Sequence, residues 1–158
     1  MLGPPYTRED IQYRFHRLYA IDLDSVAHSL RLLRRYRRAD IRFCIFRELV
    51  VAYSRPFSGN RSPGGGKHHL SLSFVPKEHR SLHDELVELR MQLIARTDFS
   101  VHEPRVSMWK TARGPVFPMK FRRPNYEGLL SRVPEIASLV TAVEAALQVA
   151  IREHEAGA

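Results

Sequence analysis

Four histidines near the middle of the chain have the chemistry that is easiest to name. His79 and His83 are four residues apart, which puts two imidazoles on one face of a helix, and His68 and His69 precede them. Imidazole nitrogens bind zinc, so a zinc site is conceivable here. However, no cysteine or carboxylate lies at a spacing typical of zinc sites, and the HExxH pattern is absent. The sequence therefore favours solvated histidines at a loop–helix junction and predicts neither a metal nor another cofactor.

The glycine run Gly64-Gly65-Gly66 followed by Lys67 invites comparison with a phosphate-binding loop. That motif needs an earlier glycine at fixed spacing, a Ser or Thr after the lysine to hold magnesium, and a preceding strand. Here the spacing is wrong, His68 follows the lysine, and a helical pattern precedes the run. A flexible linker is the better interpretation.

Cations form two groups that could bind a polyanion. The first is a stripe at three- and four-residue spacing, which gathers guanidinium groups on one helix face. The second alternates cations with aromatic residues, a mixture suited to single-stranded nucleic acid because cations bind phosphates and rings stack on unpaired bases. If its phenylalanines are core residues instead, the second group is only a basic loop. The stripe is Arg31, Arg34, Arg35 and Arg38, and the second group is Trp109, Lys110, Arg113, Phe117, Lys120, Phe121, Arg122 and Arg123.

Arg90 is a long cation beside an apolar helix seam, with His83 two turns earlier on the same face. Such a side chain must either extend its charged end to solvent or find a partner. Two interpretations stay open for Arg90. It binds an anion, or it holds a helix C-terminus or an inter-helix carboxylate.

Apolar periodicity predicts the helices that position these residues. Helices are expected over residues 22–38, capped by Asp22 or Asp24, over 41–54, capped by Asp40, from Pro76 to about 96, and from about 131 to 153. Residues 6–19 could add a short helix. Residues 55–76 are predicted to be a loop, and residues 105–110 and 116–122 could form a hairpin around Gly114-Pro115. The sequence predicts one all-α domain over residues 1–158, a four- to five-helix bundle with a long Gly/Pro-rich loop and a possible short β-hairpin. Its predicted core is Leu30, Leu33, Ile45, Leu49, Leu86, Leu89, Leu93, Leu139 and Val143.

Within residues 55–98, Leu89-Arg90 and the run 95–98 resemble a motif of HEPN-type helical domains. In that family, an arginine near a helix end is followed four to six residues later by a histidine. Arg90 stands where the family has its arginine, Arg96 stands where the histidine belongs, and Met91 replaces a polar residue.

The resemblance implies a helical bundle, often a dimer, in a superfamily of RNA-directed nucleases, toxins and non-catalytic RNA or nucleotide binders. Such domains often act beside a partner protein encoded in the same gene neighbourhood. Active members cleave RNA without metal, with the arginine holding phosphate and the histidine transferring protons. Arg96 cannot exchange protons near neutral pH, although two arginines can still grip a phosphate. The resemblance therefore predicts no catalytic residue and includes Arg90 and Arg96 among the candidate nucleic-acid-binding residues.

The positive net charge fits either of two interpretations, an anionic partner or a charge that only keeps the protein soluble. The chain carries +8, with 12 Lys and Arg against 6 Asp and Glu in residues 1–61 and 11 against 6 in residues 62–123. The last 35 residues carry 2 against 5.

The lone cysteine, Cys44, is expected to be a buried thiol, since it lies in an apolar stretch. No apolar run reaches the ~20 residues that span a bilayer, and residues 1–5 lack signal-peptide features, so we expect a cytoplasmic location.

The expected function is therefore a non-catalytic HEPN-like homodimer that binds RNA or another polyanion. One alternative is a structural or protein-interaction bundle whose basic faces only confer solubility. A metal-independent ribonuclease that uses His83 or His102 with Arg90 ranks lowest.

Overall fold

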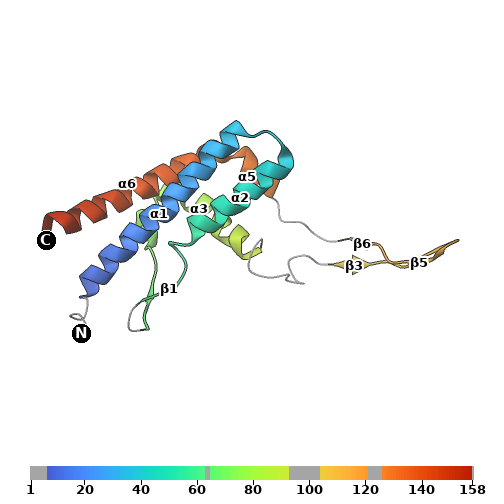
Figure 1. Ribbon diagram of the computed structural model, residues 1–158, viewed down its shortest axis with the longest axis horizontal. Coiled ribbons are helices and arrows are strands. Elements are labelled where there is room, and N and C mark those ends of the chain that lie inside the picture. The colour runs from blue at the N-terminus through green and yellow to red at the C-terminus, as the bar shows by residue number, and fades with distance from the viewer. Residues whose placement is uncertain (1–6, 63–64, 93–103, 121–125, 158) are drawn as a thin grey trace.

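A computed structural model describes residues 7–62, 65–92, 104–120 and 126–157. Long helices form most of it, and a slender β-hairpin extends away from them (Figure 1). The prediction that the chain is mainly α-helical is confirmed.

The first helix, α1 (Arg8–Arg35), is longer than predicted. Its N-cap is Thr7, whose hydroxyl accepts from the backbone N–H of Asp10, while the Asp10 carboxylate accepts from the backbone N–H of Thr7. This capping box satisfies helix-start N–H groups that would otherwise lack partners. The predicted start at Asp22 and the separate short helix over residues 6–19 are both wrong, because the two segments form one helix. The helix also ends earlier than expected, at Arg35 rather than Arg38, and Tyr36 has extended backbone angles.

The second helix, α2 (Ala39–Ser54), has an apolar sequence almost all round, but only part of it is buried. Its buried residues run from Phe46, in the middle of the helix, to Ser54 at its end. Cys44 is exposed, so the predicted buried thiol is wrong. Asp40 lies in the first turn rather than at the cap, which is Arg38 and makes no side-chain capping hydrogen bond. The apolar composition of the first part of the helix therefore did not determine its burial.

The segment after α2 contains more structure than the predicted loop. Strands β1 (Asn60–Arg61) and β2 (Lys67–His68) pair antiparallel, with Asn60 opposite His68. Gly65 has φ +87° near the turn, a left-handed conformation that glycine adopts without strain. Two 3-10 turns follow, η1 (Leu72–Phe74) and η2 (Lys77–His79).

Three more helices complete the described helical part. These are α3 (Arg80–Arg90), α5 (Tyr126–Ser131) and α6 (Val133–Gly157). Pro134 lies in the first turn of α6, where its missing N–H costs no helical hydrogen bond. The part of the predicted third helix beyond residue 92 lies outside the described residues.

The predicted hairpin is present. Strand β3 (Arg105–Val106) pairs with β6 (Met119–Lys120), and β4 (Trp109–Thr111) pairs with β5 (Gly114–Val116). Its turn lies at Ala112-Arg113, two residues before the predicted Gly114-Pro115. Gly114 has φ +116°, so a residue with a side chain would be strained there.

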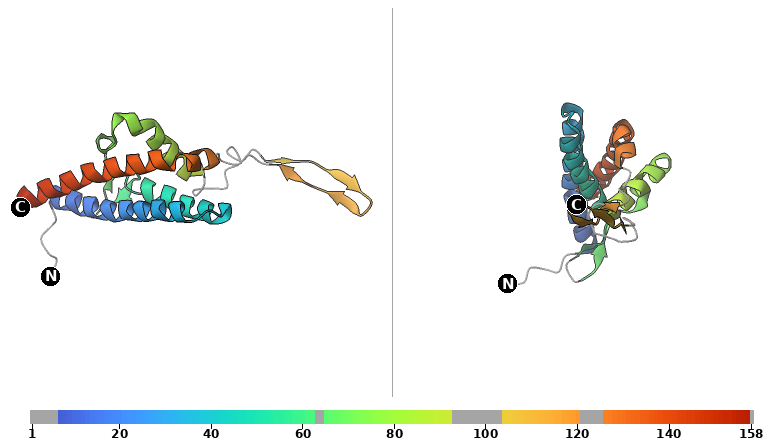
Figure 2. Two further views of the ribbon diagram at one scale, coloured as in Figure 1. Left: turned by 90° about the horizontal axis from the view of Figure 1, so that it is seen from above. Right: turned by 90° about the vertical axis from the view of Figure 1, so that its right-hand side faces the viewer.

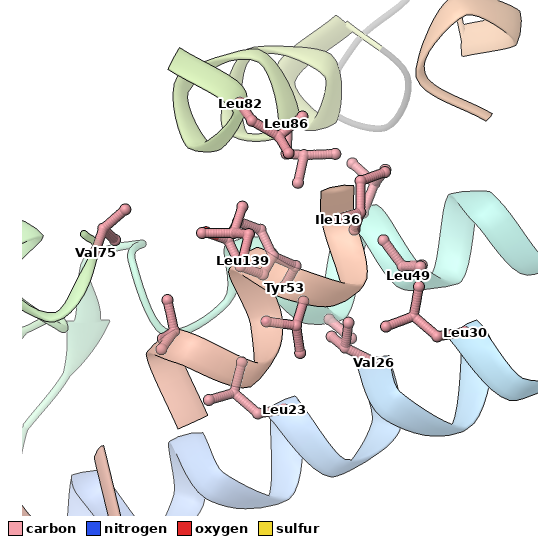
Figure 3. Close-up of a cluster of buried hydrophobic side chains, with 14 of the residues drawn as sticks. Leu23, Val26, Leu30, Leu49, Tyr53, Val75, Leu82, Leu86, Ile136 and Leu139 are labelled. Carbon is pink, nitrogen blue, oxygen red and sulfur yellow. The ribbon is translucent and has the colours of Figure 1, made fainter. Parts of the chain in front are cut away.

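Side chains from α1, α2, α3, α5 and α6 meet in one core. Helix α1 packs along α2 and α6, and α3 packs against α2. Figure 3 shows Leu23, Val26 and Leu30 of α1 pointing toward Leu49 and Tyr53 of α2 and Leu139 of α6. Of the predicted core residues, Ile45 is only partly buried and Leu93 lies outside the described residues. The others are buried, namely Leu30, Leu33, Leu49, Leu86, Leu89, Leu139 and Val143.

By length and composition alone, helix α6 is long and apolar enough to cross a membrane. This differs from the expectation that the chain has no apolar run of that length. Only 33% of its most apolar window is buried within the protein. The buried residues, from Val133 to Ile151, belong to the shared core.

Candidate nucleic-acid interface

Three of the four arginines in the predicted stripe lie on α1. Arg31, Arg34 and Arg35 are on its last turns, and all three are exposed. Arg38 is not on this helix, because α1 ends at Arg35, and it forms an ion pair with Asp40 at 2.7 Å. The stripe therefore consists of three helical arginines and a fourth beyond the α1–α2 turn, whose charge is partly balanced.

Arg42, which the sequence did not single out, holds the turn between α1 and α2. Its Nη1 donates to the carbonyl oxygens of Leu33 and Tyr36, at the end of α1. Carbonyls at a helix C-terminus lack intrahelical partners, so a cation there is favourable. Arg42 thus fixes the direction in which the chain leaves the exposed arginines. No sequence signal marks it, because its partners lie on another helix.

The long hairpin formed by strands β3 to β6 separates its side chains onto two faces. Its register pairs Arg105 with Lys120 and Trp109 with Val116, and Ser107 N donates to Pro118 O between these pairs. Successive side chains of a strand point to opposite faces. Arg105, Trp109 and Lys120 therefore share one face, which we call the Trp109 face.

The opposite face is apolar near its middle. The same register puts Met108 opposite Phe117 and pairs Val106 with Met119, so these four side chains gather there. We call this the Met108 face. Each of the four is more than half exposed. The alternative that Phe117 is a core residue is wrong, because its side chain is 61% exposed.

The Trp109 face combines an aromatic ring with cations. Trp109 is 63% exposed, and Arg105 and Lys120 are exposed on the same face. Nearer the tip, Lys110 is exposed on the Met108 face, since it follows Trp109 in the strand, and Arg113 is exposed in the turn. Residues 104–120 contain these four cations and no carboxylate. The predicted residues Phe121, Arg122 and Arg123 lie outside the described residues, and Arg105 is a cation that the sequence interpretation missed.

Arg90 lies apart from these surfaces. It is half-buried, and its Nη1 donates to the Ser58 hydroxyl at 3.0 Å. That hydroxyl in turn donates to the backbone carbonyl of Ser54, the last residue of α2, at 2.8 Å. This geometry favours the interpretation that Arg90 holds a helix C-terminus, acting through Ser58. Arg96 lies outside the described residues.

His83 is a core residue, so the expectation of a solvated histidine is wrong for it. It is 4% exposed, its Nδ1 lies 2.8 Å from the Tyr53 hydroxyl, and its ring contacts Phe57 edge-on. Burial lowers the pKa of His83, an effect that the nearby Asp84 opposes, and burial raises the pKa of Tyr53. A substrate cannot reach His83 to exchange protons with it. His102, the other candidate of the ribonuclease hypothesis, lies outside the described residues.

The remaining histidines do not converge on a metal site. The His68 ring stacks on Phe15 and hydrogen-bonds Tyr19, while His79 lies 3.4 Å from the Ser138 hydroxyl. His69 is exposed. Within the described ranges, no group of three His, Cys, Asp or Glu side chains is placed to hold a metal ion.

Two buried histidines, His16 and His83, make stability depend on pH, because burial lowers the pKa of each. His83 has a lowered pKa in the folded protein, whereas in the unfolded chain it titrates near its usual pKa of about 6.5. The unfolded state therefore binds more protons as the pH falls below that value, and stability is lost. We expect the free energy of unfolding, measured in urea, to decrease between about pH 7 and pH 5. His83→Gln should reduce this slope, and His28→Gln, on the outer side of α1, is the control. A slope that is unchanged in His83→Gln would contradict the assignment.

No family model matches the chain, and neither the curated proteins nor the solved structures include one that it significantly resembles.

Proposed function

We propose that the chain is a non-catalytic HEPN-like helical bundle that binds single-stranded RNA or a similar polyanion. The observation that carries this proposal is the Trp109 face, where an exposed indole lies with Arg105 and Lys120 on a hairpin that projects from the helices. Aromatic rings stack on unpaired bases, and cations bind the phosphates between them. A single strand is the preferred ligand because a duplex hides its base faces.

A second cluster of cations supports the same proposal. Arg31, Arg34 and Arg35 lie near the α1–α2 turn, at the end of the helical part from which the hairpin extends (Figures 1 and 2). A strand that stacks on Trp109 could then continue toward these arginines. Fluorescence anisotropy with a labelled single-stranded RNA tests the proposal, and a duplex of equal length is the comparison. Tighter binding of the single strand is the expected result.

The proposed function is binding without cleavage. Arg96 replaces the histidine that active relatives of this type would use, and His83 is buried. We expect no metal-independent cleavage of single-stranded RNA above background. Cleavage that persists through purification and disappears in Arg90→Ala, with folding unchanged by circular dichroism, would contradict this expectation.

Arg96→His tests whether the missing proton-transfer group is the only defect. Because Met91 also departs from the family pattern, we expect at most weak activity.

A second candidate function, protein interaction, is favoured by the Met108 face. Val106, Met108, Phe117 and Met119 present an exposed apolar surface, which often marks an interaction site. A two-stranded hairpin is also only marginally stable alone in water. The two candidate functions differ in what accompanies the purified protein. A high ratio of absorbance at 260 nm to that at 280 nm indicates co-purified nucleic acid, and a low ratio favours the protein-interaction function.

We also propose a homodimer in the cytoplasm, consistent with the family resemblance. Pairing of two Met108 faces would bury apolar surface while leaving both Trp109 faces outward. Two-fold pairing is the commonest arrangement of homo-oligomers. Light scattering at tens of micromolar should give twice the mass of the 18.3 kDa chain. Met108→Asp should lower that mass to the monomer value, whereas a monomer in the unaltered protein would contradict the proposal.

A further inference from the structure

The start of α1 and the β1–β2 hairpin lie at the other end of the molecule from the β3–β6 hairpin (Figure 1). A pocket lies between them. Its volume is about 520 Å³. This lies in the range of small-molecule sites, roughly 300–1,000 Å³. Arg8, Ile11 and Gln12 of α1 form one wall. The opposite wall comes from the hairpin and contains Ser62, Gly66, Lys67, His68 and His69.

The charge of the lining distinguishes this pocket from two others in the described part of the chain. Arg8 and Lys67 contribute two full positive charges, two imidazoles lie beside them, and none of the described lining residues carries a carboxylate. The pocket beside α3 and α5 has Glu85 and Glu88 with Arg132, and the pocket between α1 and α6 is lined by two acids and two arginines. Of these three pockets, the one at the start of α1 has a lining whose full charges are all positive, which favours an anionic ligand.

His68 is held in a defined orientation. Its ring stacks on Phe15, with 4.3 Å between ring centroids and 2° between planes. The Tyr19 hydroxyl lies 2.9 Å from Nδ1 of His68 and 3.2 Å from Asn60 Nδ2, so a hydrogen bond fixes one edge of the imidazole ring. In the tautomer where Tyr19 donates to Nδ1, the proton of the neutral ring lies on Nε2, and His68 can donate to a ligand from that atom.

Lys67 is supported along its aliphatic chain. A Cβ atom placed on Gly59 would lie 3.2 Å from Lys67 Cδ, so the lysine stem passes closely over the Gly59 backbone. A larger residue at position 59 would displace the stem. The pocket thus combines a supported ammonium group, a guanidinium from the first turn of α1 and an oriented imidazole N–H. These are donors suited to the oxygens of a phosphate.

We propose that this pocket binds a terminal phosphate group, carried either by a free mononucleotide or by the 5′ end of a nucleic-acid strand. A phosphate monoester has three strongly accepting oxygens and up to two negative charges, which match the number and type of donors here. An internal phosphodiester has only one charge and is a weaker ligand. The proposal is separate from RNA binding by the hairpin, since it uses different residues at the other end of the helical part.

Isothermal titration with inorganic phosphate, a nucleoside monophosphate and the unphosphorylated nucleoside tests the pocket. We expect saturable binding of the monophosphate and none of the nucleoside. The double variant Arg8→Ser/Lys67→Ser should weaken binding by about tenfold for each charged side chain that it removes. The matched control is Lys77→Ser/Arg80→Ser, which removes the same two charges from exposed positions outside this lining. Melting temperatures check that each variant is folded.

A second arm compares 5′-phosphorylated and 5′-hydroxyl RNA of one sequence and thereby identifies the source of the phosphate. A 5′-phosphate preference that is absent in Arg8→Ser/Lys67→Ser but kept in Trp109→Ala assigns a strand end to the pocket, whereas binding of the mononucleotide without that preference assigns a free nucleotide. The proposal is overturned if the monophosphate does not bind at millimolar concentration, or if both double variants weaken its binding equally. RNA binding through Trp109 could survive either result, so failure of the two proposals is distinguishable.

Discussion

Trp109→Ala is expected to lower the affinity for single-stranded RNA about tenfold. The indole is 63% exposed and lies on the hairpin face that also carries Arg105 and Lys120, so its ring is available to a base. Stacking of one base on an aromatic ring contributes ~1–3 kcal/mol, which corresponds to roughly five- to 150-fold in affinity. Anisotropy titrations at constant, moderate salt measure the change.

The matched control for Trp109→Ala is Met108→Ala. Met108 is 58% exposed and adjacent in sequence, but the hairpin register puts it on the opposite face. We expect Met108→Ala to leave RNA affinity within about twofold of the unaltered protein. If both variants reduce affinity equally, the hairpin acts through its overall structure rather than through the Trp109 face.

Leu89→Ala is expected to lower the free energy of unfolding by ~2–5 kcal/mol. Leu89 is 5% exposed and belongs to the core that α3 shares with α2 and α6. Removal of its side chain leaves a cavity that a packed interior fills only partly. Since a domain of this kind has a total stability of only ~5–15 kcal/mol, the variant should unfold at much lower urea concentration.

Leu72→Ala makes the same chemical change at an exposed site. Leu72 lies in η1 and is 51% exposed, so its loss should cost well under ~1 kcal/mol. A Leu89→Ala effect no larger than that of Leu72→Ala would contradict the packing of α3. Circular dichroism dominated by strand in the unaltered protein would contradict the helical fold itself.

Much of the fold could be predicted because apolar spacing reports which helix face is buried. Leu30, Leu33, Leu86 and Leu89 follow that rule and are buried. The start of α1 was missed because Asp22 and Asp24 also resemble caps, whereas Thr7 and Asp10 already formed the capping-box pattern. Cys44 shows the limit of composition, since an apolar neighbourhood in sequence does not guarantee that another element covers the side chain.

The candidate site was predictable only in part. The strand register of the hairpin and contacts between distant segments determine which side chains come together, and the sequence does not show either directly. The sequence identified the hairpin and its cations, but a turn at Gly114-Pro115 would pair Trp109 with Lys120 instead of Val116. Only the observed pairing shows which side chains gather on each face. Burial of His83 beside Tyr53 depends on two helices packing together. The hydrogen bond between Arg90 and Ser58 likewise joins segments that are far apart in the sequence.

The central claim is that exposed cations at the hairpin end bind the phosphates of a single strand, and the salt dependence of RNA affinity tests it most directly. The logarithm of affinity should fall linearly with the logarithm of salt concentration, by about 0.7 per phosphate neutralised. Arg31→Ser/Arg34→Ser/Arg35→Ser should lower both the affinity and this slope. The control Lys77→Ser/Arg80→Ser/Arg152→Ser removes the same charge from other exposed positions and should change the slope little. Equal slopes in the two triple variants, or an affinity no better than that of an unrelated protein of equal net charge, would contradict the claim.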